Sequence, residues 1–442
     1  MADAAPRILA LAEHALSRPF PLRVRAWDGS EAGPAGAPTL VLRHRRALRR
    51  LLWRPGELGL TRAWVAGDLA VDGDLYDALD RLSGVVWERG EPDVPAARSG
   101  VAAARRALDL LRDRANYRLA GEILSLAGPG LPPAPPPEEV RRRTGIAHTR
   151  RRDQAAIAHH YDVGNDFYAL VLGPSMVYSC AVWPDEGTTL EQAQAAKLDL
   201  VCRKLGLREG QRLLDVGCGW GSMVLHAVEH YGVRATGITL SVEQAAFARE
   251  RVAEAGLADR IDIRVQDYRD VADGPYDAVS SIGMAEHVGS EKYLEYARTL
   301  YALLRPGGRL LNHQIARRPL RDEEAYRIDE FIDRYVFPDG ELAPVGATVS
   351  RLEEAGFEVR DVEALREHYA RTLRAWVANL EAHWQEAARA TSPGRARVWR
   401  LYMAASALSF ERNRIGVNQV LAVRTDPDGA SGMPRTRTAW LS

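Results

Sequence analysis

The chain has 442 residues, more than one ordinary hydrophobic core holds, so we expect two domains. A hydrophobic share of 46% with 27% charged residues is typical of a globular protein, and no apolar run reaches the ~20 residues that a membrane-spanning helix needs. Because 59 Lys and Arg balance 59 Asp and Glu, the chain has no net charge to attract nucleic acid.

The first 125 residues mix short strand and helix signals. Residues 1–16 lack a basic n-region, so we expect no export signal. Residues 21–27, followed by Asp28-Gly29, predict a strand that enters a turn, and residues 39–43 predict a strand to pair with it. Residues 48–53 and 59–71 carry apolar side chains at helical spacing, a pattern that Asp72-Gly73-Asp74 ends. We find no catalytic cluster in this region.

Residues 131–137 read Leu-Pro-Pro-Ala-Pro-Pro-Pro, a stiff extended segment that predicts neither a helix nor an inner strand. We therefore predict an N-terminal α+β domain at 1–125, a linker rich in proline and arginine at 126–154, and a catalytic domain at 155–442. The N-terminal domain is expected to associate with lipid or membrane.

From about residue 155 the chain alternates strands and helices. This rhythm predicts an α/β fold, a doubly wound seven-stranded sheet with helices on both faces. Strands are expected at 212–216, 234–239, 260–265, 276–282, 309–315, 356–362 and 417–424. Helices are expected at 222–231, at 242–255 with Ser241 as N-cap, and at 292–304, which the run Arg-Pro-Gly-Gly at 305–308 ends. Residues 316–346 and 372–412 exceed a minimal sheet and predict insertions that build a substrate pocket.

Residues 213–221 read LLDVGCGWG, a glycine-rich turn between a strand and a helix. Gly217, Gly219 and Gly221 allow a tight turn and the close approach of a ligand to the N-terminus of the next helix. Dinucleotide enzymes use similar turns, and a purely structural turn stays open. With Asp215 in the preceding strand, the pattern resembles the first motif of class I S-adenosylmethionine (SAM) methyltransferases.

Five further motifs make the resemblance specific. They read HYDVGNDFY at 160–168, YSCA at 178–181, GITLSVEQ at 237–244, QDYRD at 266–270 and GMAEHVG at 283–289. In this order they resemble the cyclopropane-fatty-acyl-phospholipid synthase family, which is related to the mycolic acid cyclopropane synthases. The resemblance covers about residues 155–422, and the N-terminal third resembles the extra domain of bacterial members that act on phospholipid.

The resemblance implies which residues bind SAM. Tyr178 and Ser179 would contact the methionine end, Gly217 and Gly219 would pass beneath the cofactor, Thr239 and Gln244 would hold the ribose and tail, and Gln266 with Asp267 would meet the adenine. A solvated strand end is the structural alternative for Gln266 and Asp267.

The resemblance also implies the reaction, which methylates a cis double bond of an acyl chain and then closes a ring. A weak alkene nucleophile must meet the sulfonium methyl in a dry pocket. A bound bicarbonate ion would then take a proton from the resulting cation. The matching residues are Cys180 and Ile315, through backbone groups, with Glu286, His313 and Tyr369. Each of the three side chains could instead be a structural hydrogen-bond partner, and no step needs Cys180 as a nucleophile.

Three other functions stay open. A relative that leaves a methylene or methyl branch needs the same SAM and unsaturated chain. A small-molecule methyltransferase could use the same fold, because fold alone does not fix function. A lipid-binding protein with an inactive methyltransferase domain is the alternative outside enzymes. His313 favours ring formation, because branch-forming relatives often differ at this position.

An unsaturated phospholipid substrate requires access to a membrane. Arginine-rich runs at 43–50 and 141–152 predict attraction to an anionic surface, although a solvated helix face and a charged linker are the alternatives. No recognition motif for nucleic acid accompanies them. The three cysteines, Cys180, Cys202 and Cys218, show neither a disulfide framework nor zinc spacing. We expect a cytoplasmic enzyme without a metal, peripheral to the inner face of the cell membrane; a homodimer stays open.

Overall fold

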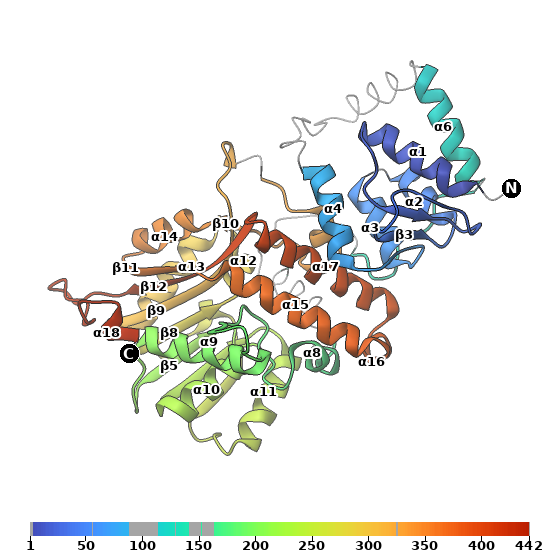
Figure 1. Ribbon diagram of the computed structural model, residues 1–442. Coiled ribbons are helices and arrows are strands. Elements are labelled where there is room, and N and C mark those ends of the chain that lie inside the picture. Colours follow the sequence, from blue (N-terminus) through green and yellow to red (C-terminus); the bar gives the residue numbers. More distant parts are fainter. Residues whose placement is uncertain are drawn as a thin grey trace. The chain divides into compact units, whose positions relative to one another are not determined.

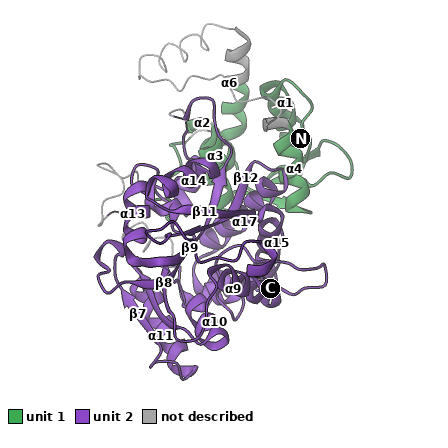
Figure 2. Ribbon diagram, turned by 90° about the vertical axis from the view of Figure 1, so that its left-hand side faces the viewer, with its two compact units in different colours: residues 1–140 green, residues 141–442 purple. Residues whose placement is uncertain are grey.

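The computed structural model describes residues 3–54, 56–87, 114–128, 130–140, 152, 163–323 and 326–441. The chain divides into two compact units, Met1–Val140 and Arg141–Ser442, which Figure 2 colours separately. The division falls inside the segment 126–154 for which the sequence predicts a linker. Each unit has a sheet and a hydrophobic core of its own.

Unit 1 surrounds a four-stranded sheet of order β2-β1-β3-β4, in which β1 and β3 are parallel. The predicted helical pattern at 59–71 is wrong in its second half. The helix ends at Val65, Gly67 turns the chain with a φ of 73°, and residues 69–72 pair antiparallel with the strand at 39–42. The elements are α1 (Ala4–Leu16), β1 (Arg23–Arg25), β2 (Glu31–Ala32), β3 (Thr39–Leu42), α2 (Arg46–Trp53), α3 (Glu57–Val65), β4 (Leu69–Asp72), α4 (Leu75–Trp87) and α6 (Arg114–Ala127).

The proline-rich segment packs within unit 1. The Arg50 guanidinium donates to the Ala134 carbonyl oxygen at 2.8 Å, and Arg62 makes two hydrogen bonds of 2.6 Å to the Glu139 carboxylate. Both contacts join α2 or α3 to the segment that follows α6. The first part of the predicted linker is therefore anchored to the N-terminal fold.

Unit 2 contains the predicted doubly wound sheet, so the fold class is confirmed. Its order is β11-β12-β9-β8-β5-β6-β7, and the two-residue β10 adds to β9. The five neighbouring strands β9, β8, β5, β6 and β7 are parallel to one another, whereas β12 runs antiparallel to both of its neighbours, β9 and β11. The strands are β5 (Arg212–Val216), β6 (Arg234–Thr239), β7 (Ile261–Val265), β8 (Tyr276–Ile282), β9 (Leu304–Arg317), β10 (Ala343–Pro344), β11 (Glu358–Ala364) and β12 (Ile415–Val423).

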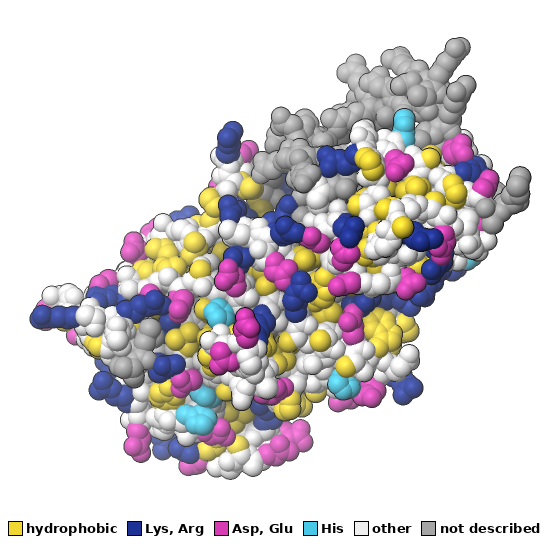
Figure 3. All heavy atoms as spheres, viewed as in Figure 1, with side chains coloured by type: hydrophobic (Ala, Val, Ile, Leu, Met, Phe, Trp, Pro, Cys, Tyr) yellow, Lys and Arg dark blue, Asp and Glu magenta, His cyan; other side chains and the backbone are white. Residues whose placement is uncertain are grey.

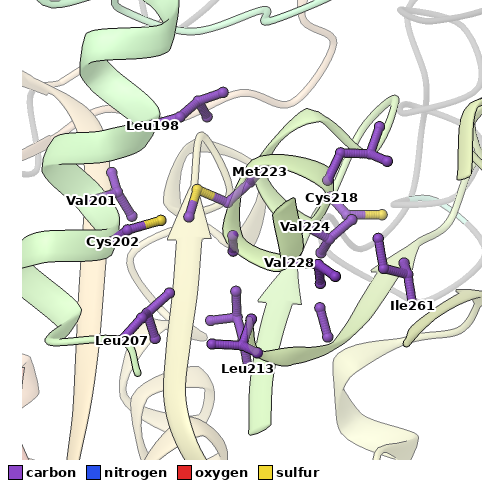
Figure 4. Close-up of a cluster of buried hydrophobic side chains, with 14 of the residues drawn as sticks. Leu198, Val201, Cys202, Leu207, Leu213, Cys218, Met223, Val224, Val228 and Ile261 are labelled. Atoms are coloured by element: carbon purple, nitrogen blue, oxygen red, sulfur yellow. The ribbon is translucent and has the colours of Figure 1, made fainter. Parts of the chain in front are cut away.

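Helices cover both faces of this sheet (Figure 1). One buried cluster joins α9, α10 and α11 to Leu213 and Leu311, and Figure 4 shows part of it. A second cluster joins α13 and α14 to Leu214 and Leu310 on the opposite face. The helices are α8 (Asn165–Leu172), α9 (Leu190–Leu205), α10 (Ser222–Tyr231), α11 (Val242–Glu254), η1 (Tyr268–Asp270), α12 (Ala285–Val288), α13 (Tyr293–Leu303), η3 (Ile332–Val336), α14 (Val345–Glu354), α15 (Arg366–Ala382), α16 (Trp384–Ala390), α17 (Pro393–Glu411) and α18 (Thr438–Leu441).

Local signals explain most boundaries in unit 2. Ser241 caps α11 as expected, because its hydroxyl oxygen accepts from the Gln244 amide at 3.2 Å. The helix expected at 292–304 ends at Leu303, directly before the predicted stop, but the start of the next strand, expected at residue 309, is wrong, since β9 begins at Leu304. The Gly307 amide donates to the Arg424 carbonyl, and the Arg424 amide donates to the Gly308 carbonyl, so this segment pairs with the end of β12.

The two predicted insertions lie beyond the strands that carry them. The first contains η3, whose Tyr335 carbonyl accepts from Arg395 of α17 at 3.1 Å. The second contains most of α15, together with α16 and α17; α15 and α17 lie side by side in Figure 1. Aromatic side chains fill the space between them, as in the contact of Tyr369 with Phe410 at 4.8 Å between ring centroids.

Candidate active site

The glycine turn follows β5 at the carboxyl edge of the sheet. Gly217 has a φ of 79°, and a Cβ there would overlap the Met284 side chain. Gly219 has a φ of 54°, and a Cβ there would meet nothing closer than 4.0 Å, so this position is open. Gly221 begins α10 and lies against Ala248 of α11. Gly217 thus permits close packing against Met284, Gly219 leaves space for a ligand, and Gly221 permits the close contact between α10 and α11.

A pocket opens at this turn and encloses about 800 Å³ of space that no protein atom fills, part of it open to solvent. It lies at the carboxyl ends of β5, β6, β7 and β8, where sheets of this type bind ligands. Its walls are Val216, Gly217, Gly219, Ile238, Thr239, Leu240, Gln244, Gln266, Asp267, Tyr268, Arg269, Ile282, Gly283, Met284, His287, Val288 and Lys292.

Polar groups at the ends of two strands are fixed by short hydrogen bonds. The Thr239 hydroxyl donates to the Gln244 side-chain oxygen at 2.9 Å, so this bond does not use the N–H groups of the Gln244 side chain. Asp267 forms an ion pair with Arg269 at 2.6 Å, and Gln266 donates to the Asp270 carbonyl at 2.8 Å. The pocket therefore has one wall of uncharged polar groups and one of paired charges.

Six of the ten predicted SAM-binding residues line this pocket, and four do not. The six are Gly217, Gly219, Thr239, Gln244, Gln266 and Asp267, and the four are Tyr178, Ser179, Asp215 and Gly221. Asp215 is buried inside the sheet, where its carboxylate accepts from the Ser280 hydroxyl at 2.6 Å. Burial raises the pKa of Asp215 to about 6, partly offset by that bond and by the Lys197 ammonium.

Tyr178 and Ser179 belong to the segment between α8 and α9, and Ser179 is buried. The Tyr178 ring lies 5.3 Å from Trp376 of α15 and 5.8 Å from Trp399 of α17, measured between centroids. It also contacts Tyr168 of α8 at 5.6 Å. The structure thus places Tyr178 in an aromatic cluster beside the insertions. The start of the motif at 160–168, residues 160–162, lies outside the described residues.

Glu286 and Ile315 meet directly. The Ile315 backbone N–H donates to Glu286 Oε1 at 2.7 Å, which ties α12 to the end of β9. Glu286 Oε2 is buried and has no hydrogen-bond partner. Burial raises the pKa of the Glu286 carboxyl to about 7, so a protonated form is accessible near neutral pH.

His313 points to the same face of β9 as Ile315, because the two are separated by one residue. Its side chain is 2% exposed, and neither ring nitrogen has a hydrogen-bond partner. Burial, with smaller contributions from Lys197 and Lys204, lowers the pKa of the imidazole to about 3. The ring is therefore neutral, with one N–H donor and one acceptor.

Cys180 and Tyr369 meet this edge through Leu365. The Leu365 amide donates to the Val417 carbonyl at 2.8 Å, and Val417 lies opposite Ile315 in the sheet. The Leu365 carbonyl in turn lies 3.6 Å from the Cys180 sulfur and accepts from the Tyr369 amide at 3.1 Å. The structure thus brings all five predicted anion-site residues to one edge, although none lines the open pocket. Burial raises the pKa of the Cys180 thiol well above its usual range.

The sequence prediction missed several pocket residues. Arg269, Met284, His287 and Lys292 line the pocket but carry no predicted role. Met284 and His287 lie within the motif GMAEHVG, on either side of Glu286, so their position in this motif could have identified them as pocket residues. Within the described ranges no group of three or more His, Cys, Asp or Glu side chains could hold a metal ion. No helix of that part is long and apolar enough to cross a membrane.

The sheet order, the glycine turn after its central strand and the pocket beside it define a SAM-dependent methyltransferase. Residues 148–420 match the family model described as mycolic acid cyclopropane synthetase. The chain belongs to this family, which also includes cyclopropane-fatty-acyl-phospholipid synthase homologues.

Individual relatives cover different shares of the chain. A probable fatty acid methyltransferase of Mycobacterium tuberculosis is 45% identical over 425 residues, which cover 94% of this chain and 93% of the relative. The cyclopropane-fatty-acyl-phospholipid synthase of Escherichia coli is 37% identical over 270 residues, 61% of this chain and 68% of the relative. The structure of the mycolic acid cyclopropane synthase CmaA1, complexed with SAH and CTAB, aligns with a TM-score of 0.58 and 34% identity, covering 61% of this chain and 97% of that one.

Proposed function

We propose that the chain transfers a methylene group from SAM to the cis double bond of an unsaturated phospholipid acyl chain, forming a cyclopropane ring. The observation that carries this proposal is the pair Glu286 and His313. Both are held at the carboxyl edge of the sheet, and both present buried polar atoms that no protein group satisfies. Buried polar atoms of this kind are rare in folded proteins unless a ligand or water satisfies them.

The pocket suits SAM. The open wall at Gly219 admits close approach of a ligand, and SAM carries no phosphate that would require a lysine in the turn. Gln266 and Asp267 would meet the adenine, and Thr239 with Gln244 would hold the ribose and tail. Tyr178, Ser179 and Asp215 do not line the pocket, and we assign them to the methionine end or to the support of the turn.

The residues around His313 also fit a bicarbonate ion. A protonated Glu286 and a neutral His313 each offer a donor, and we assign the Tyr369 phenol as a third. Cys180 and Ile315 contribute through their backbone. A bound bicarbonate would supply the base that accepts a proton from the transferred methyl group, so that the ring can close. Because an ionised Glu286 would repel an anion, its pKa of about 7 favours binding of the ion.

The aromatic cluster supplies the dry surroundings that the reaction needs. Tyr168 lies 4.7 Å from Trp220 of the glycine turn and 5.4 Å from Trp399 of α17, measured between ring centroids. The cluster thus extends from the cofactor turn to the inserted helices. An apolar wall of this kind would accommodate a hydrocarbon chain and exclude the water that would otherwise trap a cation as an alcohol.

We further propose that unit 1 approaches a membrane through apolar side chains, in addition to the arginines that the sequence predicts for this role. Arg50 is buried and bonds Asp68, with Arg46 on the same carboxylate, so part of the run at 43–50 has a structural role. Most of the run at 141–152 lies outside the described residues, and Arg152 pairs with Asp339 at 2.6 Å. Charges of both signs are mixed over the face in Figure 3. We therefore propose that exposed apolar side chains of unit 1 contribute to docking.

The exposed large apolar residues support this choice. Of the seven in the described part of the chain, all those larger than valine belong to unit 1, and Trp53 and Leu131 are 57% and 85% exposed. They are Trp53, Leu60, Leu124 and Leu131. Tryptophan and leucine are residues that enter a membrane interface readily.

A second candidate is a branch-forming fatty acyl methyltransferase. One observation favours it. A relative that covers 94% of this chain is named a probable fatty acid methyltransferase, whereas the cyclopropane-fatty-acyl-phospholipid synthase of Escherichia coli covers 61% of it. Both reactions would use the same pocket, and formation of a methylene branch differs from ring closure only in which proton leaves the methylated chain.

The deciding experiment incubates the purified protein with SAM and vesicles of an unsaturated phospholipid, followed by mass spectrometry of the lipids. A gain of one CH2 with loss of the double bond, in a product that resists hydrogenation, is the expected result. A hydrogenation-sensitive product would establish the second candidate. No mass change on any unsaturated lipid would overturn both.

A further inference from the structure

A buried glutamine lies directly opposite His313 in the sheet. Gln419 of β12 pairs with His313 of β9 in the antiparallel register. Paired residues on neighbouring strands point to the same face, with Cβ atoms roughly 4.5–5.5 Å apart. Gln419 is 0% exposed, and neither its side-chain oxygen nor its nitrogen has a hydrogen-bond partner. Two neighbouring buried side chains thus have four polar atoms that no protein group satisfies.

The residue on the other side of Gln419 in the sheet does not provide the missing hydrogen-bond partner. Glu363 of β11 completes the row across the sheet. Its carboxylate is engaged with Lys204 at 2.5 Å and with Arg437 at 3.0 Å. The Gln419 amide therefore lies between an ion-paired carboxylate and an imidazole without a hydrogen-bond partner. Lys197 and Lys204 both act on the His313 pKa, so positive charge is close to this face, as an anion requires.

Other buried glutamines of unit 2 behave differently. Gln194 of α9 donates to the carbonyl oxygens of Leu172 and Val177 at 3.3 and 3.2 Å, and its own oxygen accepts from Ser175. Gln314 accepts from Asn312 at 2.7 Å and donates to Thr348 at 2.7 Å. A glutamine that only supports the fold is bonded in this chain, which sets Gln419 apart.

We propose that Gln419 is a further ligand of the anion site, donating a side-chain N–H to the ion that His313 also binds. The inference rests on the proposed function for the identity of that ion, bicarbonate. It adds to the five residues of the resemblance a donor on the antiparallel strand. The amide is uncharged at every pH, so it binds the anion whether or not Glu286 is protonated.

The test compares Gln419→Met with Gln194→Met, which removes a bonded glutamine of the same burial. Each protein is studied in buffer freed of carbon dioxide and then with added sodium bicarbonate. In the absence of bicarbonate, Gln419→Met should melt roughly 2–4 °C higher than the parent chain, because an unsatisfied buried amide is removed. Gln194→Met should melt lower, because it leaves carbonyl oxygens unpaired.

Bicarbonate should raise the Tm of the parent chain and of Gln194→Met, but not that of Gln419→Met or Gln419→Glu, whose carboxylate would repel the ion. Methyl transfer by Gln419→Met should fall at least tenfold at fixed bicarbonate, with binding of S-adenosylhomocysteine unchanged. An equal bicarbonate response in Gln419→Met and the parent chain would overturn the role of Gln419 alone. A parent chain whose Tm and activity ignore bicarbonate would overturn the bicarbonate part of the proposed function as well.

Discussion

At the scale of single residues, two glycines of the turn have different roles: Gly217 permits close packing, and Gly219 leaves space for a ligand. Gly217→Ala should lower the unfolding free energy by about 1–3 kcal/mol, because the new methyl group meets Met284 at a positive φ. Gly219→Ala has the strain of positive φ without the contact, so it should destabilise by about 1 kcal/mol and mainly weaken SAM binding. Urea unfolding and calorimetric titration with SAM measure the two effects. Equal losses of stability in both variants would contradict this assignment.

Glu286 gives stability a pH dependence of known sign. Its folded-state pKa of about 7 lies above the ordinary 4.5, so its contribution to stability is fully present below the ordinary value and is lost as the pH rises through 7. Glu286→Gln stays neutral. Relative to the parent chain, it should gain on the order of 1–3 kcal/mol between about pH 5 and about pH 8, while methyl transfer falls. Thermal melts at the two pH values test this, and a constant difference would contradict it.

At the scale of elements, one hydroxyl joins α15 to the segment that carries Cys180. Thr372 accepts from the Ala181 amide and from the Trp183 indole N–H, both at 3.1 Å, and donates to the His368 carbonyl at 2.7 Å. Thr372→Val would leave two buried donors unpaired, so we expect a loss of about 2–4 kcal/mol and weaker SAM binding. Thr372→Ser keeps the hydroxyl and should retain most of both. A serine variant as damaged as the valine variant would mean that the methyl group, not the hydroxyl, is what matters.

The elements also show how far sequence reasoning reaches. The bounds of β5, α10, β6 and β8 coincide with the prediction, because glycine turns and short apolar runs mark them locally. The start of β9 and the strand β4 could not be predicted, since partner strands far along the chain decide them. The same limit applies to the site. The motif at 283–289 contains Glu286, and the family resemblance points to His313, whereas Gln419 becomes significant only through its register with His313.

At the scale of the whole molecule, unit 2 should be able to fold by itself. The CmaA1 chain aligns over 97% of its own length with 61% of this chain, so a relative exists without a counterpart of unit 1. We expect a chain that begins at Arg141 to give one cooperative melting transition and to bind S-adenosylhomocysteine as the full chain does. An unfolded product in circular dichroism would show that unit 1 is needed for folding.

Unit 1 should matter for lipid surfaces. The double variant Trp53→Ser and Leu131→Ser removes two exposed apolar side chains of unit 1, so binding to anionic vesicles should weaken by about tenfold. Val242→Ser, at an exposed position of unit 2, is the matched control and should bind vesicles normally. Alanine substitution of the five arginines at 141–143, 150 and 151 should also weaken vesicle binding while sparing SAM. Vesicle sedimentation at low salt measures the binding of all three variants. Unchanged vesicle affinity in the Trp53 and Leu131 double variant would contradict a role of these side chains in membrane docking.

The burial of the three cysteines affects how their thiols react with SAM, which is an alkylating agent. A sulfonium methyl reacts with any thiolate within reach, and such self-alkylation would consume the donor and block the site. Burial keeps the Cys180, Cys202 and Cys218 sulfurs protonated, which makes them poor nucleophiles. The burial of these sulfurs therefore also protects the protein from alkylation by the cofactor that it binds.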